Sequence, residues 1–310
     1  MDHLLSNKIV VIVGPTASGK SDLAVKLARR FGGEIISADS RQVYKGLDIG
    51  SGKITKPEMR KITHYLLDVV SPKKVFTVSQ YQKLAQAKIR AIWKKGNLPI
   101  IIGGTGLYIR AAVDGIVFPQ VPPNFKLRKK LEKKSVEELF KILSKLDKTR
   151  AKNIDAKNPR RLIRAIEILT VMKQVPKLTA RPITDNKNIL FIGLRPNDEI
   201  LKKKIKTRLA DRLRAKGKNN LITEIKNLHK NGLSWQRLED LGLEYRYVAL
   251  FLQHKLTRQE LVAKLEQEIW HYVKRQYTWW QGDKRLHWSY NQKEIIKLCQ
   301  KFLISRPEKY

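Results

Sequence analysis

The stretch Ile9-Val10-Val11-Ile12-Val13-Gly14-Pro15-Thr16-Ala17-Ser18-Gly19-Lys20-Ser21 decides the fold of this chain. Its first five residues are all Ile or Val, which is typical of a strand buried on both faces. The rest matches the pattern G-x-x-x-x-G-K-[ST] at every specified position, and residues 21 to 30 have the spacing of an amphipathic helix. A buried strand, a glycine-rich turn and a helix in this order predict a phosphate-binding loop (P-loop).

The predicted loop has a definite chemistry. Its residues are Gly14, Pro15, Thr16, Ala17, Ser18, Gly19, Lys20 and Ser21. The glycines let successive backbone N–H groups converge on phosphate oxygens, and the N-terminus of the helix adds partial positive charge. Lys20 reaches the outer phosphates, and the Ser21 hydroxyl is placed to hold Mg²⁺. The pattern indicates a phosphate group, but it does not distinguish ATP from another diphosphate bound with Mg²⁺.

The rest of the chain predicts an α/β fold with a helical insertion. Predicted strands at 34–37, 99–102 and 189–194 alternate with helical patterns at 78–95 and from residue 196 to about 280. This rhythm favours a P-loop NTPase-like parallel sheet flanked by helices. Prolines at 119, 122 and 123 and a second cluster of breakers at 176–188 enclose a lysine-rich helical region. We expect a catalytic core at 1–117 and 187–310, and a smaller helical domain at 118–186.

Two polar positions follow predicted strands of the sheet. Asp39 comes just after the strand at 34–37, and Thr105 lies in the Gly-Gly-Thr-Gly turn that ends the strand at 99–102. Because ligands of open parallel sheets bind at the carboxyl ends of the strands, both should face the phosphate loop. Asp39 has the options of binding Mg²⁺, capping a helix or acting as a general base. Thr105 is either a donor to the ligand or part of a tight turn.

A typical P-loop ATPase needs a second acidic residue at the end of an apolar strand, where it holds Mg²⁺. No apolar strand of this sequence ends in such a residue, and Asp68, after Tyr65-Leu66-Leu67, is the nearest candidate. The residues after Asp68 have the pattern of a loop. The sequence therefore does not favour ATP hydrolysis.

The charge balance points to a polyanionic partner. The chain has 64 Lys and Arg against 28 Asp and Glu, a formal charge of +36. Such a field costs self-repulsion, which binding to phosphates offsets; the alternative is a generally lysine-rich proteome. The single cysteine, Cys299, cannot form an internal disulfide, and no apolar run is long enough to span a membrane. We expect a cytoplasmic protein that acts as a monomer without a membrane partner.

A set of motifs in fixed order narrows this interpretation. They are Gly14–Ser21, Ser37–Gln42, Tyr44–Lys53, His64–Asp68, Gly103–Tyr108, Asn158–Glu167 and Lys274–Trp280. Together they resemble the tRNA dimethylallyltransferase (tRNA isopentenyltransferase) family, from about residue 8 to about residue 288. The resemblance implies transfer of a dimethylallyl group from dimethylallyl diphosphate to the exocyclic amine of the adenosine 3′-adjacent to the tRNA anticodon, with release of diphosphate.

The resemblance also assigns roles to residues. Asp39 is the general base, Thr105 assists catalysis, the loop and Arg208 bind diphosphate, and Ser21 binds Mg²⁺. The residues expected to contact the tRNA anticodon stem-loop are Asp39, Ser40, Arg41, Gln42, Thr105, Arg160, Arg161, Leu162, Ile163, Arg164, Lys274, Arg275, Gln276, Tyr277, Thr278, Trp279, Trp280 and Gln281. Core packing is the alternative for one member of the Trp279-Trp280 pair. Glu244 departs from the family pattern, because glycine is expected there.

Three rival functions remain open at this point. The first is a prenyltransferase that acts on a free adenine nucleotide, which would not need the arginines at 160–164 or the basic segment at 274–281. The second is a P-loop kinase of a small metabolite, which would consume ATP. The third is a non-enzymatic RNA-binding protein, in which loss of Asp39 would change no product.

Overall fold

A six-stranded parallel sheet forms the centre of the fold in the computed structural model, which describes residues 7–215, 217 and 220–305. The strands lie in the order β3 (His64–Tyr65), β2 (Gly33–Ser37), β4 (Leu98–Ile102), β1 (Ile9–Val13), β7 (Ile189–Leu194) and β8 (Leu286–Ser289). Every neighbouring pair runs parallel. All residues of β1, β2, β4 and β7 are buried, as their apolar runs predict. The expected α/β class is confirmed.

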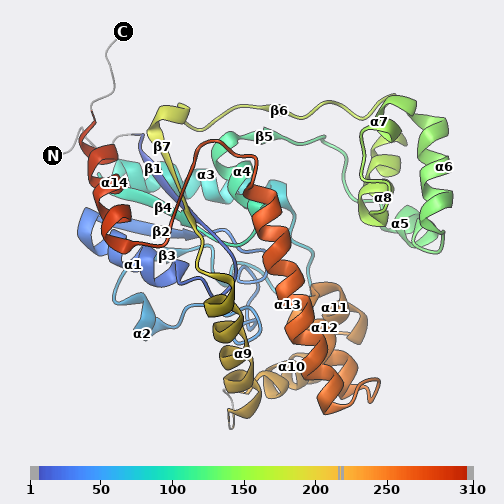
Figure 1. The fold of residues 1–310 in the computed structure, drawn as a ribbon. Coiled ribbons are helices and arrows are strands. Elements are labelled where there is room, and N and C mark those ends of the chain that lie inside the picture. The colour runs from blue at the N-terminus through green and yellow to red at the C-terminus, as the bar shows by residue number, and fades with distance from the viewer. Residues whose placement is uncertain (1–6, 216, 218–219, 306–310) are drawn as a thin grey trace. The chain divides into compact units, whose positions relative to one another are not determined.

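Helices cover both faces of the sheet. Successive residues of a strand point to opposite faces, so strands that are apolar throughout have side chains to bury on both. Val10 and Ile12 of β1 pack in one cluster with α1 (Lys20–Phe31) and α14 (Gln292–Ile304). Val11 and Val13 pack in the other with α3 (Val78–Lys94), α4 (Gly106–Asp114) and α13 (Arg258–Trp280). Figure 1 shows these helices around the sheet. The β1–α1 and β4–α4 connections carry the phosphate loop and the Gly-Gly-Thr-Gly turn.

The helical stretch predicted from residue 196 to about 280 is a series of separate helices. They are α9 (Asp198–Arg214), α10 (Leu221–Lys230), α11 (Trp235–Leu241), α12 (Leu243–Leu252) and α13. Side chains of Asn197, Asn220, Ser234 and Thr257 cap the first, second, third and fifth of these helices. Gly242, at φ 76°, separates α11 from α12. All five of these helices contribute residues to the site described below.

The chain divides into two compact units: Met1–Gly115 with Pro182–Tyr310, and Ile116–Arg181. The sequence placed the boundaries of the second unit at 118 and 186. It contains α5 (Phe125–Leu131), α6 (Val136–Leu146), α7 (Lys148–Lys152), α8 (Pro159–Leu169) and the antiparallel pair β5 (Ile116–Val117) and β6 (Thr179–Ala180). The four helices enclose a core of their own, built on Leu139, Leu143 and Leu162.

Short elements complete the description of the first unit. They are α2 (Lys56–Met59) and the 3₁₀ turn at Asn186–Asn188. Among the described residues no helix combines the length and apolarity that crossing a bilayer requires.

Candidate functional site

The phosphate loop has the backbone conformation that its glycines predict. Gly14 has φ 145° and Gly19 has φ 89°, and a Cβ on Gly14 would lie 2.8 Å from the carbonyl oxygen of Leu194. Only glycine fits both demands at this position. Lys20 begins α1 and its Nζ donates to the carbonyl oxygen of Pro15 at 2.5 Å. The Ser18 hydroxyl is buried in the loop and has no hydrogen-bond partner among the described residues. The loop thus offers donors to an anionic ligand.

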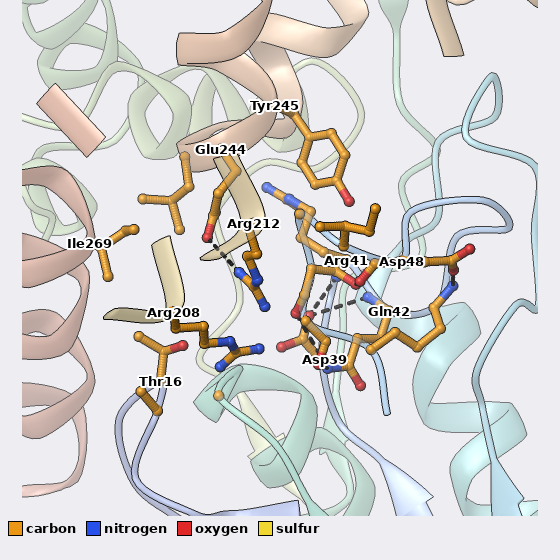
Figure 2. A pocket seen from close by; sticks show the side chains of 18 of the residues that line it. Thr16, Asp39, Arg41, Gln42, Asp48, Arg208, Arg212, Glu244, Tyr245 and Ile269 are labelled. Carbon is orange, nitrogen blue, oxygen red and sulfur yellow. Dashed lines mark hydrogen bonds and ion pairs between the residues drawn. The ribbon is translucent and has the colours of Figure 1, made fainter. Parts of the chain in front are cut away.

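The loop opens into a cleft of about 1260 Å³ within the first unit. Its walls are residues 16–22 of the loop region, 39–42 after β2, 46 and 48–55, 102–104 after β4, and residues of α9, α10, α11, α12 and α13. The cleft therefore lies at the carboxyl ends of β1, β2 and β4, where the topology predicts ligand binding. Figure 2 shows side chains of this cleft.

Asp39 stands in the cleft close to Lys20. Its Oδ1 accepts hydrogen bonds from the backbone amides of Arg41 at 2.8 Å and Gln42 at 3.3 Å. Asp39 therefore caps the turn that follows β2, rather than the helix that was one of its options. Burial lowers the pKa of Lys20 to about 8, the carboxylate of Asp39 opposes that shift, and Arg208 adds to it. A carboxylate and an ammonium group thus line one cleft.

Two arginines of α9 enter the cleft from the opposite wall. Arg208 and Arg212 point toward Asp39 (Figure 2). A Cβ on Gly52 would lie 1.8 Å from Arg208 Nη2, so the guanidinium group packs directly against that glycine. Burial, with a smaller contribution from the neighbouring Arg212, lowers the pKa of Arg208 to about 10, and the carboxylates of Glu244 and Glu58 oppose the shift. The sequence predicted Arg208 but missed Arg212, although a spacing of four places both on one helix face.

Glu244 supplies the carboxylate that faces these arginines. Arg212 Nη1 lies 3.5 Å from Glu244 Oε1, and both side chains are largely buried. Burial raises the pKa of Glu244, while Arg212 and Arg208 oppose that shift. The departure from the family pattern at this position therefore adds an ion pair to the wall of the cleft.

A second buried carboxylate holds the wall at residues 48–50. Glu224 of α10 accepts hydrogen bonds from the backbone amides of Asp48, Ile49 and Gly50 at 3.0, 2.6 and 3.1 Å. The hydroxyl of Tyr245 donates to the same carboxylate at 3.1 Å. Sequence reasoning missed Glu224, since nothing in its local pattern shows that it reaches a loop 174 residues away.

Thr105 and Asp68 are hydrogen-bonded to two residues that line the cleft, Ser40 and Lys53. The Oγ1 of Thr105 accepts from the Ser40 amide at 3.1 Å, and in the described part of the chain Thr105 does not line the cleft. Asp68 accepts from Lys53 Nζ at 2.6 Å and is likewise not a cleft residue there. Thr105 therefore supports the backbone beside Asp39, and Asp68 forms an ion pair with Lys53.

The segment at 274–281 divides into exposed and buried side chains. Lys274, Arg275, Thr278, Trp279 and Gln281 are exposed, and Tyr277 is half-buried. Trp280 is 2% exposed and packs in the core near Phe191, with ring centroids 6.2 Å apart. Gln276 is also buried, 5% exposed. One tryptophan of the pair is thus a core residue, and the other is available at the surface.

The arginines at 160–164 lie on α8 in the second unit. Leu162 and Ile163 belong to the core of that unit, while Arg160 and Arg161 are exposed. Arg164 donates to the buried carboxylate of Glu167 and to the carbonyl oxygen of Val121. Arg164 thus has a structural partner inside its unit.

The cleft also fits a magnesium ion held mainly by phosphate. The described residues contain no group of three or more His, Cys, Asp or Glu that would hold a metal alone. Mg²⁺ commonly takes one or two protein ligands and completes its shell with phosphate oxygens and water. The Ser21 hydroxyl lines the cleft beside the loop amides, as such a site requires.

Comparisons with known proteins agree with this geometry. The family model described as IPP transferase matches residues 42–283. A tRNA dimethylallyltransferase 1 from Syntrophus aciditrophicus is 41% identical over 286 residues, which cover 91% of this chain and 92% of the relative. A tRNA dimethylallyltransferase from Anoxybacillus flavithermus is 39% identical over 289 residues, covering 92% and 90%.

Solved structures show the same similarity. A full-length tRNA isopentenylpyrophosphate transferase from Bacillus halodurans superposes with a TM-score of 0.71 at 32% identity, covering 96% of this chain and 97% of the other. A eukaryotic dimethylallyltransferase acting on tRNA superposes with a TM-score of 0.78 at 25% identity, covering 98% and 81%.

Proposed function

The chain belongs to the IPP transferase family, and we propose that the two reactants of its reaction meet in the cleft between the phosphate loop and Asp39. The reaction transfers a dimethylallyl group from dimethylallyl diphosphate to tRNA. The observation that carries this assignment is the shared cleft. Lys20 and Asp39 both line it, and the carboxylate acts electrostatically on the ammonium group. The ammonium group of Lys20 suits a leaving anion, and the carboxylate of Asp39 suits a departing proton.

The diphosphate of the donor lies in the loop. The loop amides, the Ser18 hydroxyl and the start of α1 supply donors, and Lys20 and Arg208 supply positive charge. Ser21 would hold a Mg²⁺ ion, which would neutralise part of the diphosphate charge. Charge develops on the leaving oxygen as the allylic carbon–oxygen bond breaks, so these groups stabilise the transition state more than the ground state.

The acceptor is the exocyclic amine of the adenosine 3′-adjacent to the anticodon. Because that amine is out of reach in a stacked loop, the base is flipped into the cleft. Its nitrogen attacks the allylic carbon, diphosphate leaves with the electron pair of the broken bond, and Asp39 accepts the proton that the nitrogen loses. Asp39 Oδ1 is fixed by two amides, which holds the carboxylate in place for this step.

The exposed basic and aromatic residues bind the anticodon stem-loop. Arg160 and Arg161 of α8, and Lys274, Arg275 and Trp279 of α13, have the charge and ring surface that a splayed RNA loop needs. Residues 39–42 flank the flipped base, with Thr105 behind Ser40. The cleft is built within a single chain and the single cysteine, Cys299, cannot form an internal disulfide, which suits a monomer working in the reducing cytoplasm.

The test incubates the protein with labelled dimethylallyl diphosphate, Mg²⁺ and unmodified tRNA that carries adenosine 3′ of the anticodon. We expect label on that adenosine without ATP. The control is the same tRNA with guanosine at that position, which should take no label. Label in free adenine nucleotide but not in tRNA would favour the nucleotide prenyltransferase, and phosphate transfer from ATP would favour the kinase.

A further inference from the structure

Gln276 of α13 is buried and uses both ends of its amide. The backbone N–H of Thr16, in the phosphate loop, donates to Gln276 Oε1 at 3.1 Å. Gln276 Nε2 donates to the carbonyl oxygen of Gly104, in the turn after β4, at 3.1 Å. A backbone N–H only donates and a carbonyl only accepts, so these two partners fix the orientation of the amide. One side chain therefore joins two backbone segments that belong to different strand ends.

The second of these segments continues to the residues around Asp39. The amide of Thr105 donates to the carbonyl oxygen of Ala38 at 3.2 Å, and the amide of Ser40 donates to Thr105 Oγ1 at 3.1 Å. Gly103 packs so closely that a Cβ would lie 2.1 Å from Ala38 O. Hydrogen bonds therefore run from the phosphate loop through Gln276 and the turn to both neighbours of Asp39.

The fit at Gly104 is tight. A Cβ on Gly104 would lie 2.4 Å from Gln276 Nε2, so the amide reaches the turn only because residue 104 is glycine. Tyr272, one helical turn earlier, also donates to Gly104 O, at 3.3 Å. Two side chains of α13 thus hold the turn, and Gln276 joins it to the loop.

We propose that Gln276 is a positioning residue that sets the spacing between the phosphate loop and the segment carrying Asp39. The proposal rests on the function proposed above, in which one segment seats the leaving diphosphate and the other the accepting base. Transfer needs the amine, the allylic carbon and the leaving oxygen in line. A misplacement of ~1 Å costs on the order of 10²-fold in rate. Gln276 therefore acts through backbone geometry, although the sequence assigned it to tRNA contact.

The first test substitutes Gln276→Ala, with Gln267→Ala as the matched control. Gln267 is an exposed glutamine on the same helix. Single-turnover transfer is measured with tRNA and donor both saturating. We expect Gln276→Ala to slow transfer ~10- to 100-fold, with the dissociation constants of tRNA and inorganic diphosphate within about threefold of wild type. Gln267→Ala should match wild type.

The second test uses Gln276→Glu, which distinguishes positioning from general support of the fold. An ionised carboxylate accepts from Thr16 but repels the Gly104 carbonyl, whereas the protonated acid restores both bonds. The rate of this variant relative to wild type should therefore rise as pH falls from about 8 to about 5.5. Tyr272 donates to the same Gly104 carbonyl as Gln276. The charged groups that act electrostatically on Tyr272 are Asp39, Arg41, Glu244 and Arg275. They are present in both proteins, so the ratio reports the new carboxyl group.

Three outcomes overturn the proposal. A wild-type rate for Gln276→Ala does so, and so does a defect confined to the tRNA dissociation constant, which would mean direct contact with RNA. If Gln276→Ala fails to fold, a Gln276→Glu ratio that does not change with pH decides against it. Failure of wild-type protein to transfer label contradicts the proposed function instead.

Discussion

The cleft brings the pKa of Lys20 closer to neutral pH. Burial lowers its pKa to about 8, and Asp39 opposes the shift. Between pH 8 and about 10.5 the unfolded chain keeps this proton while the folded chain does not, so the free energy of unfolding rises with pH across that window. The affinity for diphosphate falls with rising pH across the same window, because only the ammonium form of Lys20 attracts the anion.

We therefore expect the dissociation constant of inorganic diphosphate to rise up to ~10-fold per pH unit above about 8. Isothermal titration calorimetry between pH 6.5 and 9 measures it. Lys20→Arg is the matched variant, since a guanidinium group stays charged throughout. It should flatten the dependence, and an equal slope in both proteins would remove Lys20 from the explanation.

The Arg212–Glu244 pair predicts strong coupling between two buried charges. Removing one partner leaves the other buried without compensation, at a cost of roughly 3 kcal/mol in the free energy of unfolding. We expect Arg212→Met and Glu244→Met each to destabilise the protein, and the double variant to cost less than the sum. A urea-denaturation double-mutant cycle measures the coupling. Additive effects would mean that the pair, with side chains 16% and 13% exposed, is energetically independent.

For single residues, the sequence predicts the chemistry of a side chain better than it predicts which residues that side chain contacts. Lys20 and Ser21 were found because the loop motif is local. Glu224 and the bridging role of Gln276 depend on contacts between distant segments, and no local pattern records such contacts. Trp279 and Trp280 differ in burial for the same reason: helix packing decides which of two adjacent rings enters the core.

At the scale of elements, one carboxylate anchors a whole wall of the cleft. Glu224 accepts from three consecutive amides at 48–50, so the loop depends on a helix far along the chain. We expect Glu224→Ala to increase hydrogen exchange at those amides by ~10-fold or more, because each loses a charge-assisted hydrogen bond. The amides of β1 serve as an internal control and should keep their protection. Unchanged exchange at 48–50 would show that the loop is held by other contacts.

The strands differ in how well the sequence predicts them. β1, β4 and β7 are continuous apolar runs, and their ends agree with prediction within about a residue. β3 has two residues and β8 is partly exposed, and both lie at sheet edges. An edge strand needs no unbroken apolar run, because only one side of it pairs and less of it is buried. Such strands are therefore visible only in the folded chain.

For the whole molecule, the charge of +36 predicts tRNA binding that depends steeply on salt. Six phosphate contacts would weaken binding ~10³-fold between 50 and 200 mM salt. Filter binding across that range measures the slope. Lys274→Ala should reduce the slope by about one. Lys301→Ala should not, since Lys301 is exposed on α14, which packs on the face of the sheet opposite α13. A flat response would mean that the charge does not serve RNA binding.

The central claim is that one cleft seats the leaving diphosphate and places Asp39 to receive the proton of the attacking amine. Asp39→Asn tests it most directly, because the amide oxygen still accepts from Arg41 and Gln42 but the side chain no longer takes a proton. Asp211→Asn, an exposed change on α9, is the control. Single-turnover transfer with both substrates bound should fall ~10²- to 10⁴-fold in Asp39→Asn, while both dissociation constants stay near wild type. A wild-type rate for Asp39→Asn would contradict the account.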